Sequence, residues 1–386
     1  MDTIVIGIDG GEWNVVDPLL KEGHLPNLSQ LVQTGVRGEL ASTTPPVSPP
    51  AWNSIQTGMN PGKHGIYDFS SFDERYQRRS VSSSDRQATP FWRVMNDSEV
   101  TTGLFKLPFT YPPDEVDGFF VTGFPTPDSV SDYANPMSVH DIVGEPEQLF
   151  ESYEKRDEGN YVGFKQNLLD VADRQTDLLL DVLDQRDPEF LLTVFDGADR
   201  LQHFFWKYVD ESHPRFKPHP ELSSAFQEYY EVIDDGIGRL LDHIDGEPNV
   251  LIISDHGFEK LSYDVYVDEW LEEAGFLTRE APGSALSTLN RSVGDIIKQA
   301  WGVVKSIGLD SQVEAILPED VFESGREMVV QSHSHQLTDW EQTSAFFSTL
   351  SGQSIFVNLE ESFAEGTVSE SEYEDVIASL REGSSS

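Results

Sequence analysis

The stretch Thr3–Ile8, which reads TIVIGI and runs directly into the tripeptide DGG at 9–11, decides the fold. Its residues are mostly apolar and β-branched, and no polar side chains alternate with them. This pattern predicts a strand covered on both faces, as in a parallel sheet between two layers of helices. Two further runs share the pattern and are expected in the same sheet: Phe190–Phe195 (FLLTVF) and Asn249–Ile253 (NVLII).

Segments with apolar residues at helical spacing lie between and after these runs. A weaker strand is expected at 119–121. Strands and helices in this order predict an α/β fold, with a central, mostly parallel sheet flanked by helices and a small helical cap or insertion. The helices are predicted at 27–35, 167–184, 223–244, 265–274 and 292–307.

Polar residues stand at the carboxyl ends of the predicted strands, where open α/β sheets place their sites. Asp9 follows the first strand, and Asp255 and His256 follow the third. Carboxylates and imidazoles are common metal ligands, and glycines beside Asp9 would let backbone and ligand approach closely. The alternative is that both segments are ordinary polar turns.

Asp199 and His203 are four residues apart in the segment DRLQH. If this segment is helical, both side chains lie on one face and aim at one point. A carboxylate and an imidazole at that spacing suit zinc or manganese. The alternative is an acidic residue in the first turn of a helix and a histidine packed among the neighbouring aromatic residues.

Ser48 lies in the segment TTPPVSPPAW, directly before Pro49 and Pro50. A serine followed by prolines is typical of a helix N-cap, which is the simpler interpretation. The same position also favours a nucleophile, because a helix N-terminus stabilises negative charge and a metal contact would lower the pKa of the hydroxyl. Neither proline has an N–H group to offer a phosphate oxygen, so metals and other donors would have to meet that charge.

In this order the motifs resemble the alkaline phosphatase superfamily, specifically its type I phosphodiesterase/nucleotide pyrophosphatase branch. The resemblance implies an alkaline phosphatase-like core at 1–258, a helical cap or insertion at 259–335 and a return to the core sheet at 336–386. It covers essentially the whole chain, and its most specific parts are the first motif block and SDHGF (254–258). It runs through IVIGIDGG (4–11), GHLPNLSQLVQTGVRGEL (23–40), TTPPVSPPAWNSIQTGMNPGKHGIYDF (43–69), FTYPP (109–113), DRLQHFFW (199–206) and LIISDHGF (251–258).

The resemblance also implies a site with two divalent metal ions, which are zinc in most family members and manganese in some related mutases. The residues at the family's first metal position are Asp9, Ser48, Asp255 and His256, with Ser48 as the nucleophile. At the second metal position the sequence offers Asp199 and His203. Asp196 is the alternative to Asp199, which we prefer because it lies four residues before His203.

Two departures from the family pattern affect the expected activity. The family completes its second metal position with a histidine near the C-terminus, in a Gly-x-His segment. This sequence has no such segment in the stretch that leads up to Ser386, and His333 and His335 lie earlier in the chain than the family's histidine does. A truncated chain, a weak second metal or an impaired homologue would each explain this. Nucleotide phosphodiesterases also carry an asparagine just past the HGI motif, where this chain has Phe69.

The composition restricts the partners. The chain has 386 residues, no cysteine and a formal net charge of −42. Disulfides and thiolate metal sites are therefore excluded, and nucleic-acid binding through a basic face is disfavoured. No apolar run is long enough to span a membrane, and we see no signal peptide. So acidic a surface repels itself unless salt screens it, which favours the salt-rich cytoplasm of a halophilic archaeon.

These observations predict a metal-dependent hydrolase of small phosphate esters, either phosphodiesters or pyrophosphates, that forms a phosphoseryl intermediate. One alternative is an impaired binding or regulatory homologue. Another is a phosphotransferase or mutase-like phosphomonoesterase. A sulfatase is disfavoured because Ser48 is followed by PPAW, without the arginine of the C/S-x-P-x-R context.

Overall fold

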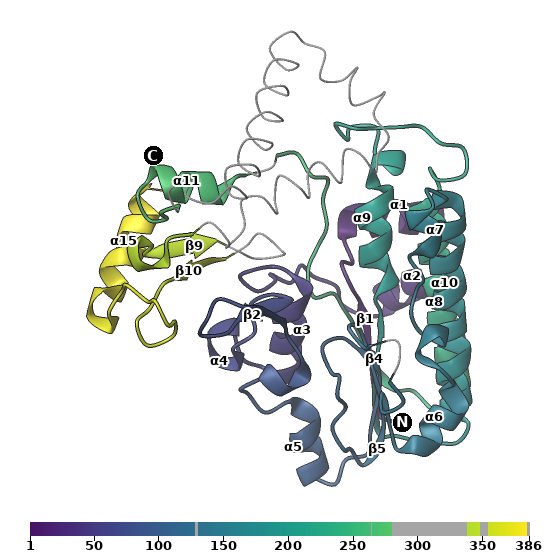
Figure 1. Cartoon of the computed structure of the whole chain (residues 1–386). Coiled ribbons are helices and arrows are strands. Elements are labelled where there is room, and N and C mark those ends of the chain that lie inside the picture. Colours follow the sequence, from purple (N-terminus) through teal and green to yellow (C-terminus); the bar gives the residue numbers. More distant parts are fainter. Residues whose placement is uncertain (128–129, 264, 280–337, 348–353, 384–386) are drawn as a thin grey trace. The chain divides into compact units, whose positions relative to one another are not determined.

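The computed structural model describes residues 1–127, 130–263, 265–279, 338–347 and 354–383 (Figure 1). The chain forms two compact units. The first comprises Met1–Phe69 and Ser80–Asp264, and the second comprises Ser70–Arg79 and Val265–Ser386. The predicted helix at 292–307 lies outside the described residues, and the division at 258 and 335 stays a prediction.

The first unit is built on a sheet that has six strands in the described residues, in the order β6-β5-β4-β7-β1-β8. All neighbouring strands are parallel except β5 and β6. This arrangement confirms the predicted α/β class with a mostly parallel sheet. The strands are β1 (Thr3–Ile8), β4 (Thr102–Leu107), β5 (Gly118–Thr122), β6 (Ala134–Asn135), β7 (Phe190–Phe195) and β8 (Asn249–Ile253).

Helices cover both faces of this sheet, as Figure 1 shows for α8, α9 and α10 on one side and α3 and α5 on the other. Alternate residues of β1 enter two separate apolar clusters: Ile4 and Ile6 pack in the larger one and Val5 in the smaller. The helices are α1 (Trp13–Glu22), α2 (Pro26–Thr34), α3 (Ser48–Thr57), α4 (Pro61–His64), α5 (Phe91–Asp97), α6 (Met137–Val143), α7 (Glu154–Asp157), α8 (Tyr161–Leu183), α9 (Gly197–Val209) and α10 (Ala225–His243).

The registers bring three strand ends to one edge. Ile8 of β1 pairs with Phe195 of β7, and Gly7 of β1 pairs with Ile253 of β8. Residues that directly follow these strands must therefore lie close together. The fold thus delivers the polar turns of the sequence to a single place.

Strands β8 and β4 differ from the sequence prediction. Strand β8 is the last in the strand order, and its Leu251 is 52% exposed in the described structure, so β8 is not covered on both faces like β1. Strand β4 was not predicted, because Gly103 and Lys106 interrupt its apolar run. Both residues are accommodated by their surroundings: Gly103 faces the ring of Phe119, and Lys106 forms a buried ion pair.

The second unit has a small core of aromatic side chains. The ring of Tyr76 stacks against those of Trp340 and Phe363, and its centroid lies 3.7 Å and 4.9 Å from theirs, respectively. Its elements are β2 (Ser70–Phe72), β3 (Arg78–Ser80), α11 (Val267–Glu273), β9 (Ala345–Phe347), β10 (Ile355–Val357) and α15 (Tyr373–Gly383). Across the described parts of both units, no helix combines the length and apolar character needed to cross a membrane.

Candidate active site

Four predicted residues converge at the carboxyl edge of the sheet. Asp9 follows β1, Asp255 and His256 follow β8, and Ser48 opens α3. The Ser48 Oγ lies 3.3 Å from Asp9 Oδ1 and 3.0 Å from His256 Nε2. The same ring nitrogen lies 3.5 Å from Asp9 Oδ1 and 3.3 Å from Asp255 Oδ2. Three segments that are distant in sequence thus present oxygen and nitrogen atoms to one small volume.

Ser48 is the first residue of α3 and not its cap. Val47 occupies the N-cap position, and no side-chain hydrogen bond closes this end of the helix. The hydroxyl of Ser48 is therefore free to face Asp9 and His256. The interpretation of Ser48 as a simple helix cap is not supported by this geometry.

The tautomer of His256 shows that the site suits a cation. Its Nδ1 lies 2.9 Å from the carbonyl oxygen of Gly257, which can only accept a hydrogen bond, so Nδ1 carries the proton. In the neutral ring, Nε2 then presents a lone pair toward the carboxylates of Asp9 and Asp255. Asp255 Oδ2 is buried and receives no hydrogen bond from the residues that the structure describes. A lone pair surrounded by carboxylate oxygens is the donor set of a divalent metal site.

The second predicted pair lies on α9 next to this group. His203 Nε2 is 3.4 Å from Asp199 Oδ2, and the ring of His203 stands edge-on to that of Phe258, with centroids 4.8 Å apart. One ligand atom each from Asp9, Asp199 and His256 lies within 4.8 Å of the other two. The two predicted metal positions are therefore adjacent.

Gly10 joins the elements that carry these groups. Its N–H donates to Asp255 Oδ1 at 3.2 Å, and its carbonyl accepts from Nε2 of Gln202 on α9 at 2.7 Å. Its φ is +67°, and a Cβ at this position would lie 3.2 Å from the Asp199 Cα. Only glycine combines this conformation with so close a backbone approach.

Asp196, the alternative to Asp199, is engaged elsewhere. Its carboxylate lies 2.8 Å from Lys106 Nζ and 2.9 Å from a guanidinium nitrogen of Arg200, and all three groups are buried. Burial acts to raise the pKa of Asp196, but the charges of Arg200 and Lys106 outweigh it and lower this pKa to about 2. Asp196 is thus neutralised by protein cations, which favours Asp199 as the ligand beside His203.

The carboxylates at the site repel one another. Burial, together with the charges of Asp255 and Asp199, raises the pKa of Asp9 well above its usual value. Burial, aided by Asp199, also raises the pKa of Asp255, to about 6. Burial acts in the same direction on Asp199, but the hydrogen bond and charge of His203 lower its pKa. Bound cations would relieve this repulsion, because a positive charge nearby favours the ionised form.

Sequence reasoning did not single out three residues that organise the site: Trp52, Lys106 and Gln202. Trp52 had a usable signal, since it lies four positions after Ser48 and so on the same helix face. Gln202 lies within the motif DRLQH, three positions after Asp199, but a glutamine amide is not a typical metal ligand. Lys106 gave no signal, because a lysine inside a strand is ordinarily solvent-exposed.

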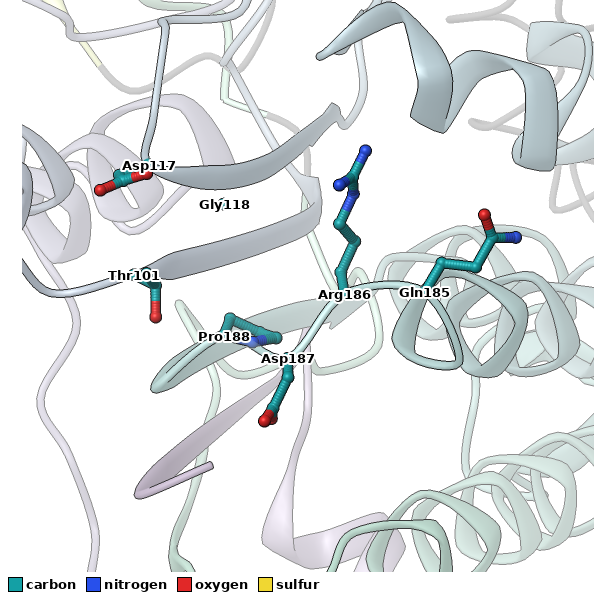
Figure 2. Close-up of a pocket in the computed structure, with 7 residues that line it drawn as sticks. All are labelled: Thr101, Asp117, Gly118, Gln185, Arg186, Asp187 and Pro188. Carbon is teal, nitrogen blue, oxygen red and sulfur yellow. The ribbon is translucent and has the colours of Figure 1, made fainter.

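A separate cavity of about 350 Å³ lies at the other end of the strands (Figure 2). Its lining includes the residues just before β4 and β7 and the first residue of β5, so it is at the amino edge of the sheet, away from Ser48. We assign it no part in the chemistry of the site. The cavity is lined by Thr101, Asp117, Gly118, Gln185, Arg186, Asp187 and Pro188.

Two solved structures are similar to this chain at low sequence identity. No curated protein matches the sequence. Among solved structures, phosphonoacetate hydrolase from Sinorhizobium meliloti 1021 in complex with phosphonoformate is similar at 16% identity and a TM-score of 0.46; the alignment covers 71% of this chain and 62% of that one, less than two thirds of its length. A 2-O GAG sulfatase is similar at 13% identity and a TM-score of 0.37, with 66% and 58% covered.

The family assignment comes from the sequence as a whole. The family model described as type I phosphodiesterase/nucleotide pyrophosphatase matches residues 3–385. This match spans both structural units and all six candidate site residues. It confirms the resemblance on which the sequence interpretation was based. The chain therefore belongs to the type I phosphodiesterase/nucleotide pyrophosphatase family.

Proposed function

We propose that this protein is a metal-dependent hydrolase of small phosphodiesters or pyrophosphates, with Ser48 as its nucleophile. The observation that carries the proposal is the position of the Ser48 hydroxyl. It stands at the start of α3, within 3.3 Å of both Asp9 Oδ1 and His256 Nε2, beside a cluster of buried carboxylates. Membership of the family supports the same type of chemistry.

We propose that the site holds two divalent cations, namely zinc, with manganese as the alternative. Asp9, Asp255 and His256, together with Ser48, would hold one ion, and Asp199 and His203 would contribute to the second. When bound, the ions would lower the pKa of the Ser48 hydroxyl and neutralise the charge of the phosphoryl oxygens.

In the proposed reaction, the Ser48 hydroxyl attacks phosphorus in line with the leaving group. The Oγ–P bond forms as the bond from phosphorus to the leaving oxygen breaks, and the proton of the hydroxyl ends on the leaving group. The product is a phosphoseryl intermediate, which still carries the second ester group when the substrate is a diester. Water then attacks the same phosphorus, which releases phosphate or a phosphomonoester and restores the serine. Because Pro49 and Pro50 have no N–H, and the N–H of Ala51 bonds to Val47, the start of α3 contributes few backbone donors to the phosphoryl group.

Hydrolysis of model esters tests this function. We expect the purified protein in molar KCl to hydrolyse a bis-aryl phosphodiester, to lose this activity on chelation and to regain it with Zn²⁺ or Mn²⁺. An aryl phosphomonoester serves as the comparison substrate, and faster monoester turnover would favour the mutase-like alternative. Absence of turnover with two bound metals per chain would contradict the proposal, whereas one metal or none would favour an impaired homologue.

The charge of −42 supports a salt-rich cytoplasm as the working environment. Screening shortens the Debye length from about 10 Å at 0.1 M to about 3 Å at 1 M salt. We therefore expect the melting temperature to rise steeply between 0.1 and 1 M KCl, as repulsion among surface carboxylates is screened. Thermal unfolding followed by circular dichroism measures this, with sucrose as an uncharged control. A melting temperature that is flat or falls with KCl would contradict it.

A further inference from the structure

Trp52 connects α3 to the strand that carries Asp9. Its side chain is fully buried in the smaller apolar cluster, four residues after Ser48 on the same helix. A Cβ at Gly7 of β1 would lie only 2.5 Å from Cη2 of the indole ring. Strand β1 therefore accommodates this ring only because residue 7 has no side chain.

The indole distinguishes the two oxygens of Asp9. Its Nε1 donates to Asp9 Oδ2 at 2.8 Å, in a buried hydrogen bond. The other oxygen, Oδ1, faces the Ser48 hydroxyl at 3.3 Å and His256 Nε2 at 3.5 Å. Asp9 Oδ2 thus accepts a hydrogen bond from α3, whereas Asp9 Oδ1 faces the site.

We infer that Trp52 is a positioning residue that fixes the carboxylate of Asp9 so that Oδ1 alone serves as a metal ligand. This inference rests on the metal site of the proposed function. Hydrogen-bond partners of metal ligands orient those ligands, and their loss costs about 10–100-fold in metal affinity or activity. Since Trp52 and Ser48 share one face of α3, the same contact also sets the position of the nucleophile relative to Asp9.

The chain provides a matched control. Trp92 is also fully buried in the same cluster, and its Nε1 donates to Asp114 Oδ2 at the same distance of 2.8 Å. The variants Trp52→Phe and Trp92→Phe both lose a buried indole and its hydrogen bond to an aspartate. Only Trp52→Phe removes one from a proposed metal ligand.

Zn²⁺ affinity, measured by competition with a chromophoric chelator, distinguishes a positioning role of Trp52 from a purely structural one. We expect the Zn²⁺ affinity of the tighter metal site to fall about 10–100-fold in Trp52→Phe. In Trp92→Phe, the same affinity should stay within about threefold of the wild-type value. The visible spectrum of the Co²⁺-loaded protein should change only in Trp52→Phe, because a released carboxylate can bind through both oxygens. Equal affinities in the two variants overturn the inference. A wild-type protein that binds no metal overturns the proposed function instead.

A second pair of variants keeps the test decisive if Trp52→Phe does not fold. Gly7→Ala displaces the indole without removing its N–H group. Its control is Gly103→Ala in β4, where the new Cβ would lie 2.7 Å from the ring of Phe119. We expect Gly7→Ala to weaken Zn²⁺ binding and Gly103→Ala to leave it unchanged; equal affinities overturn the inference.

Discussion

The variant Ser48→Ala is expected to lose phosphodiester hydrolysis by on the order of 10³-fold or more while it keeps its fold and still binds metal through Asp9, Asp255 and His256. The loss should be large because the proposed mechanism makes this hydroxyl the group that forms the bond to phosphorus. Stability should change little, because Ser48 makes no capping hydrogen bond in α3. Turnover of a bis-aryl phosphodiester, measured beside metal content and melting temperature, checks all three expectations.

Ser54 on the same helix offers a matched control. Its Oγ lies 3.0 Å from Nε2 of His64, the same distance as that between Ser48 Oγ and His256 Nε2. Ser54→Ala thus removes an equivalent serine–histidine contact away from the carboxylate cluster, and it should retain activity. Undiminished turnover in Ser48→Ala would contradict the nucleophile assignment.

The covalent intermediate distinguishes a nucleophile from a residue that only orients the substrate. Rapid acid quenching during turnover of the bis-aryl phosphodiester should leave one aryl phosphoryl group on the wild-type peptide that contains Ser48. Mass spectrometry would detect it, and it should be absent in Ser48→Ala. If that peptide is never phosphorylated while turnover is fast, direct attack by water replaces the two-step mechanism.

The sequence was most informative where one simple rule applied. Strands β1, β7 and β8 begin and end at the predicted residues, because uninterrupted apolar runs in an α/β chain are most stable in the sheet. Since the carboxyl ends of parallel strands share an edge of the sheet, the sequence alone predicts that Asp9, Asp255 and His256 lie close together. Proximity of Ser48 to them was implied only by the family resemblance.

Other features depend on contacts between distant residues. Asp196 and Asp199 both follow β7, and nothing local shows that Lys106, 90 residues before Asp196, neutralises one of them. Likewise, a glycine such as Gly7 ordinarily weakens a strand, and only the structure shows that the ring of Trp52 fills the space beside it. His333 and His335 lie outside the described residues, so it stays a prediction that neither of them completes the second metal position.

The buried ion network beside the site predicts a large loss of stability on removal of one charge. Lys106 and Arg200 together balance Asp196 and Glu151, with Lys106 Nζ 2.8 Å from Asp196 and Arg200 contacting both acids. Lys106→Met leaves a net negative charge in the interior. We expect it to lower the free energy of unfolding by about 3–5 kcal/mol, as is typical when one partner of a buried pair is removed.

Restoring neutrality should restore stability. The double variant Lys106→Met/Asp196→Asn again leaves one cation, Arg200, opposite one anion, Glu151, so it should recover part of the loss. Lys155→Met, which breaks an exposed pair with Glu158, should change the free energy of unfolding by less than about 1 kcal/mol. Urea unfolding in molar KCl at pH 7.5 measures these values.

The choice of pH follows from the pKa of Asp196. That pKa is lowered to about 2 from an ordinary value of 3.8, so the folded protein holds this proton less tightly than the unfolded chain. Its stabilising contribution is therefore complete above about pH 4 and is lost as the pH falls toward 2. If Lys106→Met costs no more than Lys155→Met at neutral pH, or if the double variant is less stable than Lys106→Met, charge balance is not what stabilises this part of the fold. If both expectations hold, the network explains how Asp196 can stay ionised beside the site while Asp199 remains available to a metal.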